Sequence, residues 1–183
     1  TSENMFITGR AGTGKSFLLQ CFLQHTKKNA VVVAPTGVAA LNVHGSTIHG
    51  VFGLKPELQV PEKIDGSVIY GRKQETFKKI ETLIIDEISM VRSDLMDTID
   101  YILKRANRNN LPFGGKQVIV FGDLYQLPPV LNDGTDESKY IIDRYGGKFF
   151  FDAKAIQEYG ISIYELREVF RQDDQGLINI LNH

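Results

Sequence analysis

A glycine-rich segment near the start of the chain restricts the possible folds more than any other feature of the sequence. It has a glycine, four further residues and then Gly-Lys-Ser, and it reads Gly9-Arg10-Ala11-Gly12-Thr13-Gly14-Lys15-Ser16. A short apolar run at residues 5–7 precedes it, and an apolar run with helical spacing at residues 17–23 follows it. A phosphate-binding loop needs this setting, with a strand before it and a helix after it. The segment therefore predicts an α/β domain of the P-loop NTPase class.

The residue types in this loop suit the triphosphate of ATP. Its glycines allow tight turns in which backbone N–H groups converge on a phosphate, and the next helix points its positive end at the same anion. Lys15 is expected to reach the β- and γ-phosphates, and the Ser16 hydroxyl to bind Mg²⁺. The alternative is a glycine-rich turn without a ligand. The predicted ATP contacts are Gly9, Ala11, Gly12, Thr13, Gly14, Lys15 and Ser16.

Length, charge and cysteine content narrow the class of protein further. The 183 residues, 42% of them apolar, suit one α/β domain with a substantial core. Because the net charge is −1, any binding of nucleic acid needs a local groove and not a generally basic surface. There is no run of 18 apolar residues, no secretory signal at the start and a single cysteine. We therefore expect no membrane span and an intracellular protein, cytoplasmic in a bacterium and nuclear or mitochondrial in a eukaryote.

Strands and helices alternate along the chain. This alternation predicts a mainly parallel sheet with helices on both faces. Thr36 is expected to cap a helix at 37–41, Ser93 to cap a longer helix, and Asp152 and Gly160 to bracket a short one. The expected strands are residues 30–34, 82–85, 117–121 and 161–166, with a turn at 112–115 and a core cluster at 149–151.

Residues 53–75 break this alternation. Glycine, proline and mixed charges interrupt any apolar period there, which predicts an insertion or small subdomain instead of a core layer.

Polar side chains follow the later strands, where an open α/β sheet binds its ligands. Asp86 is expected to hold Mg²⁺ through water, and Glu87 to orient the attacking water and accept its proton. Gln126 and Arg171 come after the last two strands and are candidates to reach the γ-phosphate. Alternatively, Gln126 is a loop amide bonded to the backbone and Arg171 forms an exposed ion pair.

The chain resembles the first RecA-like motor domain of superfamily 1B DNA helicases of the PIF (petite integration frequency) type. The resemblance runs from about residue 5 to the end, and the interval from Ser93 to Val130 is its most specific part. The matching blocks are FITGRAGTGKS, APTGVAA, HGSTIHG, LIIDEISMV, PFGG, GDLYQLPPV and LREVFRQ. The resemblance implies 5′-to-3′ movement on single-stranded DNA, with Gln126 sensing the γ-phosphate and Arg171 as this domain's arginine.

Two of these blocks carry the DNA contacts that the resemblance implies. Pro35, Thr36, Gly37 and Val38 match the first block, and Thr47 and His49 match the second. Backbone N–H groups, hydroxyls and an imidazole can follow a strand without a strongly basic surface. The alternatives are a helix cap for Thr47 and a locally bonded histidine for His49.

The resemblance also implies a division of the whole protein. Residues 1–183 correspond to the first motor domain, with 53–75 in the position of the family's small wedge at the duplex fork. A second RecA-like domain of the same polypeptide would close the ATP cleft, so we expect the chain alone to be nearly inactive. The implied partners are ATP, single-stranded DNA and forked or structured DNA, with a monomeric protein and no membrane.

Two functions outside the helicase class remain open on the sequence. An NTPase that remodels protein or transfers phosphate would have the same loop without a DNA groove. A nucleotide-dependent switch would bind nucleotide without turning it over. A RecD-like helicase is a third alternative inside the main class.

Overall fold

The fold is built on a six-stranded parallel sheet with the strand order β3-β2-β4-β5-β1-β6. The computed structural model describes residues 3–168. The strands are β1 (Met5–Gly9), β2 (Ala30–Ala34), β3 (Ser46–Thr47), β4 (Thr82–Ile85), β5 (Gln117–Gly122) and β6 (Ser162–Leu166). This arrangement confirms the predicted α/β fold class.

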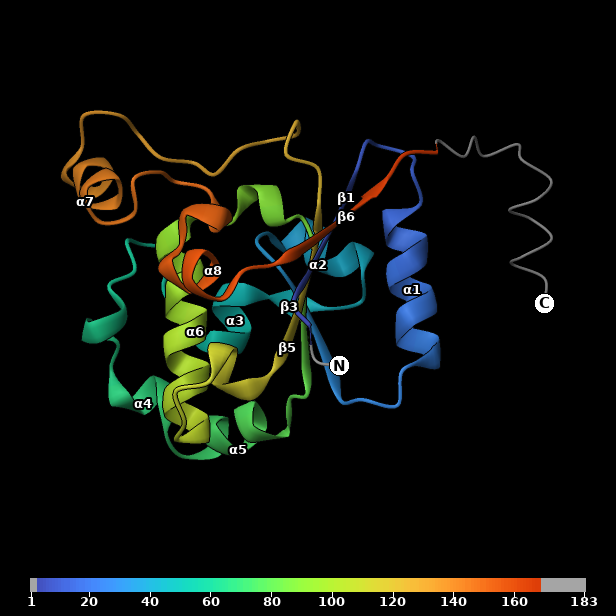
Figure 1. Ribbon diagram of the computed structural model, residues 1–183. Coiled ribbons are helices and arrows are strands. Elements are labelled where there is room, and N and C mark those ends of the chain that lie inside the picture. Colours follow the sequence, from blue (N-terminus) through green and yellow to red (C-terminus); the bar gives the residue numbers. More distant parts are fainter. Residues whose placement is uncertain (1–2, 169–183) are drawn as a thin grey trace.

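Helices cover both faces of the sheet (Figure 1). Helix α1 (Lys15–His25) lies on one face, and α6 (Ser93–Asn107) and α8 (Lys154–Tyr159) lie on the other. The shorter helices are α2 (Gly37–Asn42), α3 (Ile48–Phe52), α4 (Gly66–Ile69), α5 (Arg72–Lys79) and α7 (Asp136–Tyr145), with 3₁₀ turns η1 (Pro61–Lys63), η2 (Ile88–Met90), η3 (Pro112–Gly115) and η4 (Phe150–Asp152). Within residues 3–168, no helix has the length and apolarity that crossing a membrane requires.

The central strands are apolar because both of their faces are covered. Every residue of β4 and β5 is buried, and Ile85 pairs with Val120 across them. Strand β6 stands at the edge of the sheet, and there Ile163 is 66% exposed. Continuous apolar runs are typical of strands inside a doubly covered parallel sheet, which is why the central strands could be located from the sequence.

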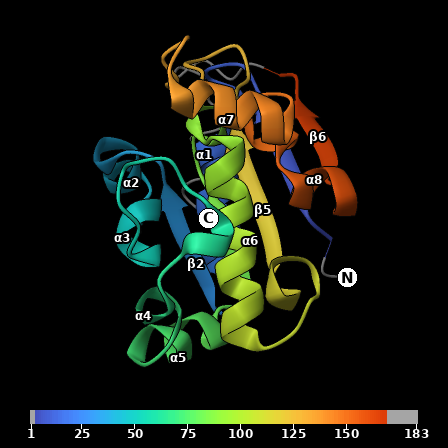
Figure 2. The same ribbon diagram turned by 90° about the vertical axis from the view of Figure 1, so that its left-hand side faces the viewer.

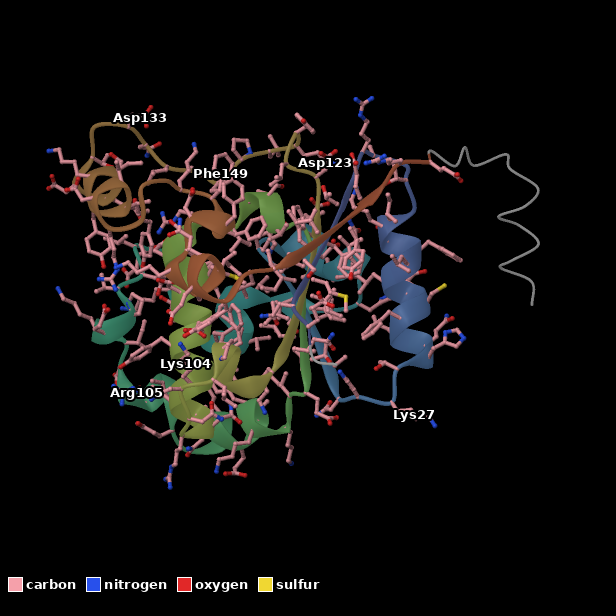
Figure 3. The ribbon with its side chains drawn as sticks, viewed as in Figure 1. Lys27, Lys104, Arg105, Asp123, Asp133 and Phe149 are labelled. Atoms are coloured by element: carbon pink, nitrogen blue, oxygen red, sulfur yellow. The ribbon has the colours of Figure 1, made fainter. Side chains whose placement is uncertain are left out.

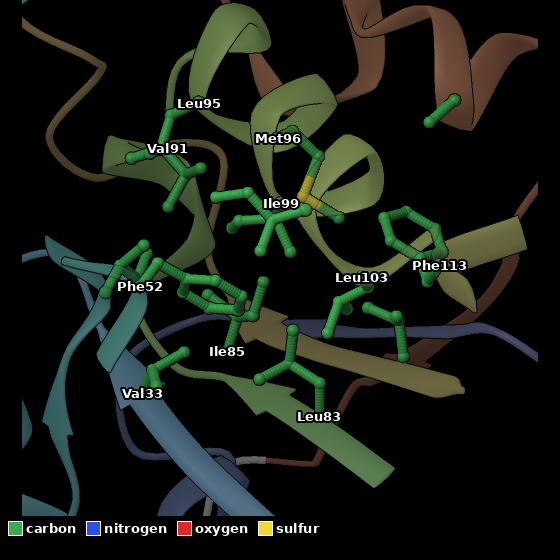
Figure 4. Packing of buried hydrophobic residues seen from close by; sticks show 14 of the residues in the cluster. Val33, Phe52, Leu83, Ile85, Val91, Leu95, Met96, Ile99, Leu103 and Phe113 are labelled. Carbon is green, nitrogen blue, oxygen red and sulfur yellow. The ribbon is translucent and has the colours of Figure 1, made fainter. Parts of the chain in front are cut away.

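Helix α6 lies across one face of the sheet (Figure 2) and contributes a stripe of apolar side chains to the core on that face. Its apolar residues recur at helical spacing and pack onto β4, β2 and α3, where they meet Leu83, Ile85, Val33 and Phe52 (Figure 4). The buried stripe consists of Leu95, Met96, Ile99, Ile102, Leu103 and Ala106.

Three aspartates of α6 are also buried, and each binds a backbone N–H of a different loop. Asp94 accepts from the N–H of Gln59 at 2.8 Å, Asp97 from Ala155 at 2.9 Å and Asp100 from Phe113 at 2.7 Å. A buried carboxylate is stable only when such donors satisfy it. The helix therefore fixes three other segments of the chain, and two of them, at Gln59 and Ala155, are distant from their aspartates in sequence.

Two predicted helix caps are wrong. Arg92, not Ser93, is the N-cap of α6, because the Ser93 hydroxyl donates to the carbonyl of Gly147 at 2.9 Å. Ala153, not Asp152, precedes α8, and the Asp152 carboxylate instead accepts from the N–H of Phe149. Thr36 caps α2 and Gly160 ends α8 as predicted.

The segment 53–75 forms short helices and turns that pack along α6. Ile69 is 3% exposed and packs into the large core, so the segment is anchored there, while its interpretation as an insertion stays a prediction. An ion pair between Arg144 of α7 and Glu62 of η1 also ties it down. The expected core cluster at 149–151 holds for Phe150, at 1% exposure, whereas Phe151 is 38% exposed.

Candidate nucleotide site and adjoining hollows

The predicted site residues that the structure describes gather at the carboxyl edge of the parallel strands. The phosphate loop follows β1, Pro35 follows β2, Asp86 follows β4, and the loop that carries Gln126 follows β5. Parallel strands bring the loops after them to one edge, where such sheets bind ligands. Arg171 lies outside the described residues, so its predicted role stays a prediction.

The phosphate loop is folded around the ammonium group of Lys15. The Lys15 Nζ donates to the carbonyl of Gly9 at 2.6 Å and to that of Arg10 at 3.1 Å. The buried Thr13 hydroxyl donates to the same Arg10 carbonyl at 2.8 Å. A side chain at Gly9 would collide with this hydroxyl, because its Cβ would lie 2.5 Å from Thr13 Oγ1. The carbonyls of the loop thus fix the position of the Lys15 ammonium group.

Asp86 and Glu87 lie close to this lysine and to each other. Burial raises the pKa of Asp86, while a backbone hydrogen bond and Lys15 act in the opposite direction. Burial is also the main cause of the raised pKa of Glu87, followed by the charge of Asp86, and Lys15 again lowers it. Glu87 has φ 52°, a left-handed conformation that is uncommon outside glycine. Such raised values in adjacent carboxylates mark candidate catalytic groups.

The oxygen ligands here fit Mg²⁺ only together with a bound nucleotide. Within the described residues, no group of three or more His, Cys, Asp or Glu side chains could hold a metal ion. Mg²⁺ in nucleotide sites is usually held by one or two protein oxygens, phosphate oxygens and water. Ser16, the residue after Lys15, offers a hydroxyl of that kind, and Asp86, whose pKa the Lys15 charge lowers, offers a carboxylate.

Asp123 is a site residue to which the sequence analysis gave no role. It is 6% exposed, and its carboxylate accepts from the N–H of Tyr125 at 3.0 Å and from the Gln126 amide at 3.4 Å. It therefore orients Gln126, and its charge also contributes to the raised pKa of Glu87. The available signal was an acid directly after a buried strand, the same signal that identified Asp86.

Gln126 and Glu87 line one hollow of about 240 Å³ together with Thr36 and Val38. Ser89 lines it too, and in the described part of the chain its buried hydroxyl has no hydrogen-bond partner. A buried hydroxyl without a partner is unusual and remains available to a ligand or water. Residues predicted to act on ATP and residues predicted to contact DNA therefore line the same hollow.

The residues predicted to contact DNA line two further hollows beside this one. Thr36 and His49 line a hollow of about 190 Å³ with Arg92, and Gly37 and Thr47 line an open one of about 630 Å³. Burial and then the charge of Arg92 lower the pKa of His49, so its imidazole is neutral at pH 7. Thr36 lines two of these three hollows, and its neighbour Gly37 lines the third, so the three lie side by side.

Both predicted threonines also cap helices. The Thr36 hydroxyl accepts from the N–H of Ala39 at 3.2 Å, and the Thr47 hydroxyl accepts from Gly50 at 3.1 Å. The cap predicted as the alternative role of Thr47 is therefore present. Each hydroxyl still has its proton to donate, so a cap and a phosphate contact are compatible.

A parallel sheet with a phosphate loop after β1 and an acid pair after β4 defines a RecA-like P-loop NTPase domain. Comparison with known proteins narrows this class. The model of the PIF1-like helicase family matches residues 1–177, and the chain belongs to that family. The family resemblance inferred from the sequence blocks is therefore confirmed.

Relatives and solved structures agree with this assignment. The chain is 38% identical to the ATP-dependent DNA helicase PIF1 of Saccharomyces cerevisiae over 98% of its length, and 34% identical to that of Homo sapiens over 98%. It covers only 21% and 26% of those two proteins. A crystal structure of Bacteroides Pif1 bound to single-stranded DNA matches with a TM-score of 0.87 at 44% identity, over 98% of this chain and 42% of that one. The chain thus corresponds to a motor domain of a PIF1-family DNA helicase.

Proposed function

We propose that the chain is the nucleotide-binding half of an ATP-driven motor that moves 5′ to 3′ along single-stranded DNA and separates duplexes. The observation that carries this proposal is the hollow that Glu87 and Gln126 share with Thr36 and Val38. A motor must couple hydrolysis to its grip on a strand, and here the two sets of residues have a common wall. The named relatives are DNA helicases, which supports the same proposal.

Each residue then has a chemical task. ATP binding would draw the Lys15 ammonium from the carbonyls of its own loop to the β- and γ-phosphates. Ser16 and Asp86 would hold Mg²⁺, which neutralises phosphate charge when bound. Glu87 would take the proton of the attacking water, and Gln126, oriented by Asp123, would contact the γ-phosphate.

DNA would run along the row of hollows. Backbone N–H groups at Gly37 and Val38 and the hydroxyls of Thr36 and Thr47 would contact its phosphates. Neutral His49 would donate one hydrogen bond without adding charge. ATP would close this domain onto a second motor domain, and hydrolysis would release it, which moves the strand only if ATP binds the closed state more tightly.

The test is steady-state ATP hydrolysis by a longer protein that carries this chain together with a second motor domain. At fixed salt, a single-stranded oligonucleotide is expected to raise the rate at least about tenfold, which corresponds to about 1.4 kcal/mol of the barrier, whereas blunt duplex raises it little. Hydrolysis that ignores DNA would favour a protein-remodelling NTPase. Nucleotide binding without hydrolysis under either condition would favour a switch.

Replacing both Thr47 and His49 with alanine is expected to weaken single-strand affinity about tenfold while sparing the basal ATPase. The double change removes two hydrogen-bond donors, each of which contributes about 0.5–1.5 kcal/mol. Fluorescence anisotropy with a labelled oligonucleotide measures the affinity.

Loss of the α3 cap is a separate effect of the alanine at position 47. Thr47→Asn with His49→Ala restores a capping side chain, since asparagine is a good N-cap. If the cap-restored variant binds DNA as the unchanged protein does, His49 does not contact the strand and position 47 needs no hydroxyl, only a capping side chain.

A further inference from the structure

A second groove lies at the C-terminal end of α6, at the opposite end of that helix from His49. Its volume is about 650 Å³, and among its lining residues are Tyr70, Tyr101, Lys104, Arg105, Arg108 and Asn110. We call it the α6 groove. Lys104 and Arg105 lie far from Asp123, which marks the carboxyl edge of the sheet (Figure 3). The groove is therefore separate from the nucleotide site and from the hollows beside it.

Two arginines leave positive charge in the α6 groove that no acid neutralises. Lys104 pairs with Asp100 at 2.7 Å and bonds the Tyr159 hydroxyl at 2.6 Å, so its charge is compensated. Arg105 and Arg108 are exposed, and neither forms an ion pair within residues 3–168. None of the described residues that line the groove is acidic. The whole chain has a net charge of −1, so the excess of positive charge in the α6 groove does not follow from a generally basic sequence.

Two tyrosine rings also line the α6 groove, and one of them contacts the Arg105 guanidinium. The Arg105 Cζ lies 5.2 Å from the centroid of the Tyr101 ring, which holds this side chain against the helix. Tyr70, at the end of α4, is 50% exposed on another wall. A guanidinium forms two parallel hydrogen bonds to a phosphate, and exposed tyrosine rings stack with bases. Arginine and tyrosine together therefore recognise a phosphodiester strand better than a simple anion.

The backbone conformation of Arg108 is a second reason to expect an anionic ligand in the α6 groove. It ends α6 in the left-handed region at φ 55°, where glycine or asparagine is the usual choice. The helix dipole favours any cation near this end, but a lysine or arginine one turn earlier would serve it without the strain. A ligand that needs charge at this position would explain the arginine.

We propose that the α6 groove is a second binding site for the phosphodiester backbone of nucleic acid. Helix α6 has 15 residues and is about 22 Å long at 1.5 Å per residue. At the stacked rise of 3.4 Å per step, about seven nucleotides of one molecule span that length between the two sites. The backbone could belong to a long single strand or to the duplex arm of a fork.

The test uses a double variant of the chain that combines Arg105→Gln and Arg108→Asn. It is compared with a control variant that loses the same number of positive charges elsewhere. Asparagine tolerates the left-handed conformation at position 108. The control, Lys27→Gln with Lys139→Gln, removes the same charge from exposed residues, and Lys27 lies on the far side of the molecule (Figure 3). Thermal unfolding followed by circular dichroism confirms that both variants are folded.

The two variants are titrated over a range of salt with a single strand of about six nucleotides, one of about 20 nucleotides and a fork with a blunt duplex arm. The double variant is expected to lose about tenfold in affinity for one of the longer probes, and the slope of log K against log salt to fall by about 1.5–2. Loss with the fork alone assigns the duplex arm, and loss with the long strand assigns single-stranded nucleic acid.

Unchanged affinity and slope for all probes, equal to those of the control, would overturn the proposal and leave the arginines to the helix dipole or to an acidic protein. This outcome is independent of the Thr47 and His49 variants, which test the strand site at the other end of α6.

Discussion

Replacing Lys15 with alanine is expected to reduce ATP turnover about 10²–10³-fold in a protein with a complete cleft. The loss of one preorganised group that stabilises developing charge typically has an effect of this size. Lys15 is the cation that the phosphate loop holds on the carbonyls of Gly9 and Arg10. Without it, the β- and γ-phosphates lose a full positive charge at the point where negative charge accumulates.

The same substitution should also change the pH dependence of any remaining activity. Lys15 lowers the pKa values of both Asp86 and Glu87, so its removal lets both values rise further. The acidic limb of the rate profile is then expected to move to higher pH. Steady-state rates across the pH range, together with binding of a fluorescent ATP analogue, measure the two effects separately.

Lys27→Ala provides the matched control, because Lys27 is an exposed lysine beyond the end of α1. It removes the same charge and is expected to leave turnover unchanged. If Lys15→Ala behaves like this control, the loop does not bind the triphosphate and the assignment of the nucleotide site fails.

Local patterns allowed the sheet to be predicted, and long-range contacts explain what was missed. Strand β4 was predicted correctly because burial on both faces leaves a run of apolar residues. Ser93 was wrongly predicted to cap α6 because its hydroxyl is taken by Gly147, which lies 54 positions away in sequence. Asp94 also has a partner that is distant in sequence, the Gln59 N–H, and no sequence pattern indicated this contact. Such contacts depend on the tertiary fold, and a local sequence pattern does not show which distant residue will be the partner.

The site residues could be predicted where the motif and its place after a strand are compatible with a single role. The phosphate loop and Asp86 follow strands of the sheet, and the structure places both at its carboxyl edge. Asp123 was missed because its role is to orient another side chain, Gln126, which spacing alone does not show. Thr47 is harder still, since a helix cap and a DNA contact require the same residue type.

Replacing Glu87 with glutamine is expected to keep ATP binding and to reduce hydrolysis about 10²–10⁴-fold, the range that general acid–base catalysis contributes. Glutamine has nearly the same shape, so contacts with nucleotide persist, but its amide cannot accept a proton from water. Single-turnover hydrolysis with bound ATP separates the chemical step from binding. Undiminished hydrolysis would remove Glu87 from the role of base.

The same variant has an opposite and measurable effect on stability, and its sign follows from the raised pKa of Glu87. Burial and the neighbouring charge of Asp86 make the ionised form unfavourable in the folded chain. The protonated form therefore contributes stability that is complete below the ordinary carboxyl pKa and is lost as the pH rises through the raised value.

Since glutamine is never ionised, Glu87→Gln should be more stable than the unchanged chain to urea at pH 7, with a difference that shrinks as the pH falls toward 4. The sign of the stability change therefore separates two roles. Replacing a catalytic base raises stability in this way, whereas replacing a carboxylate with a structural role lowers it. Equal or lower stability of the variant at pH 7 would contradict the raised pKa, whatever happens to hydrolysis.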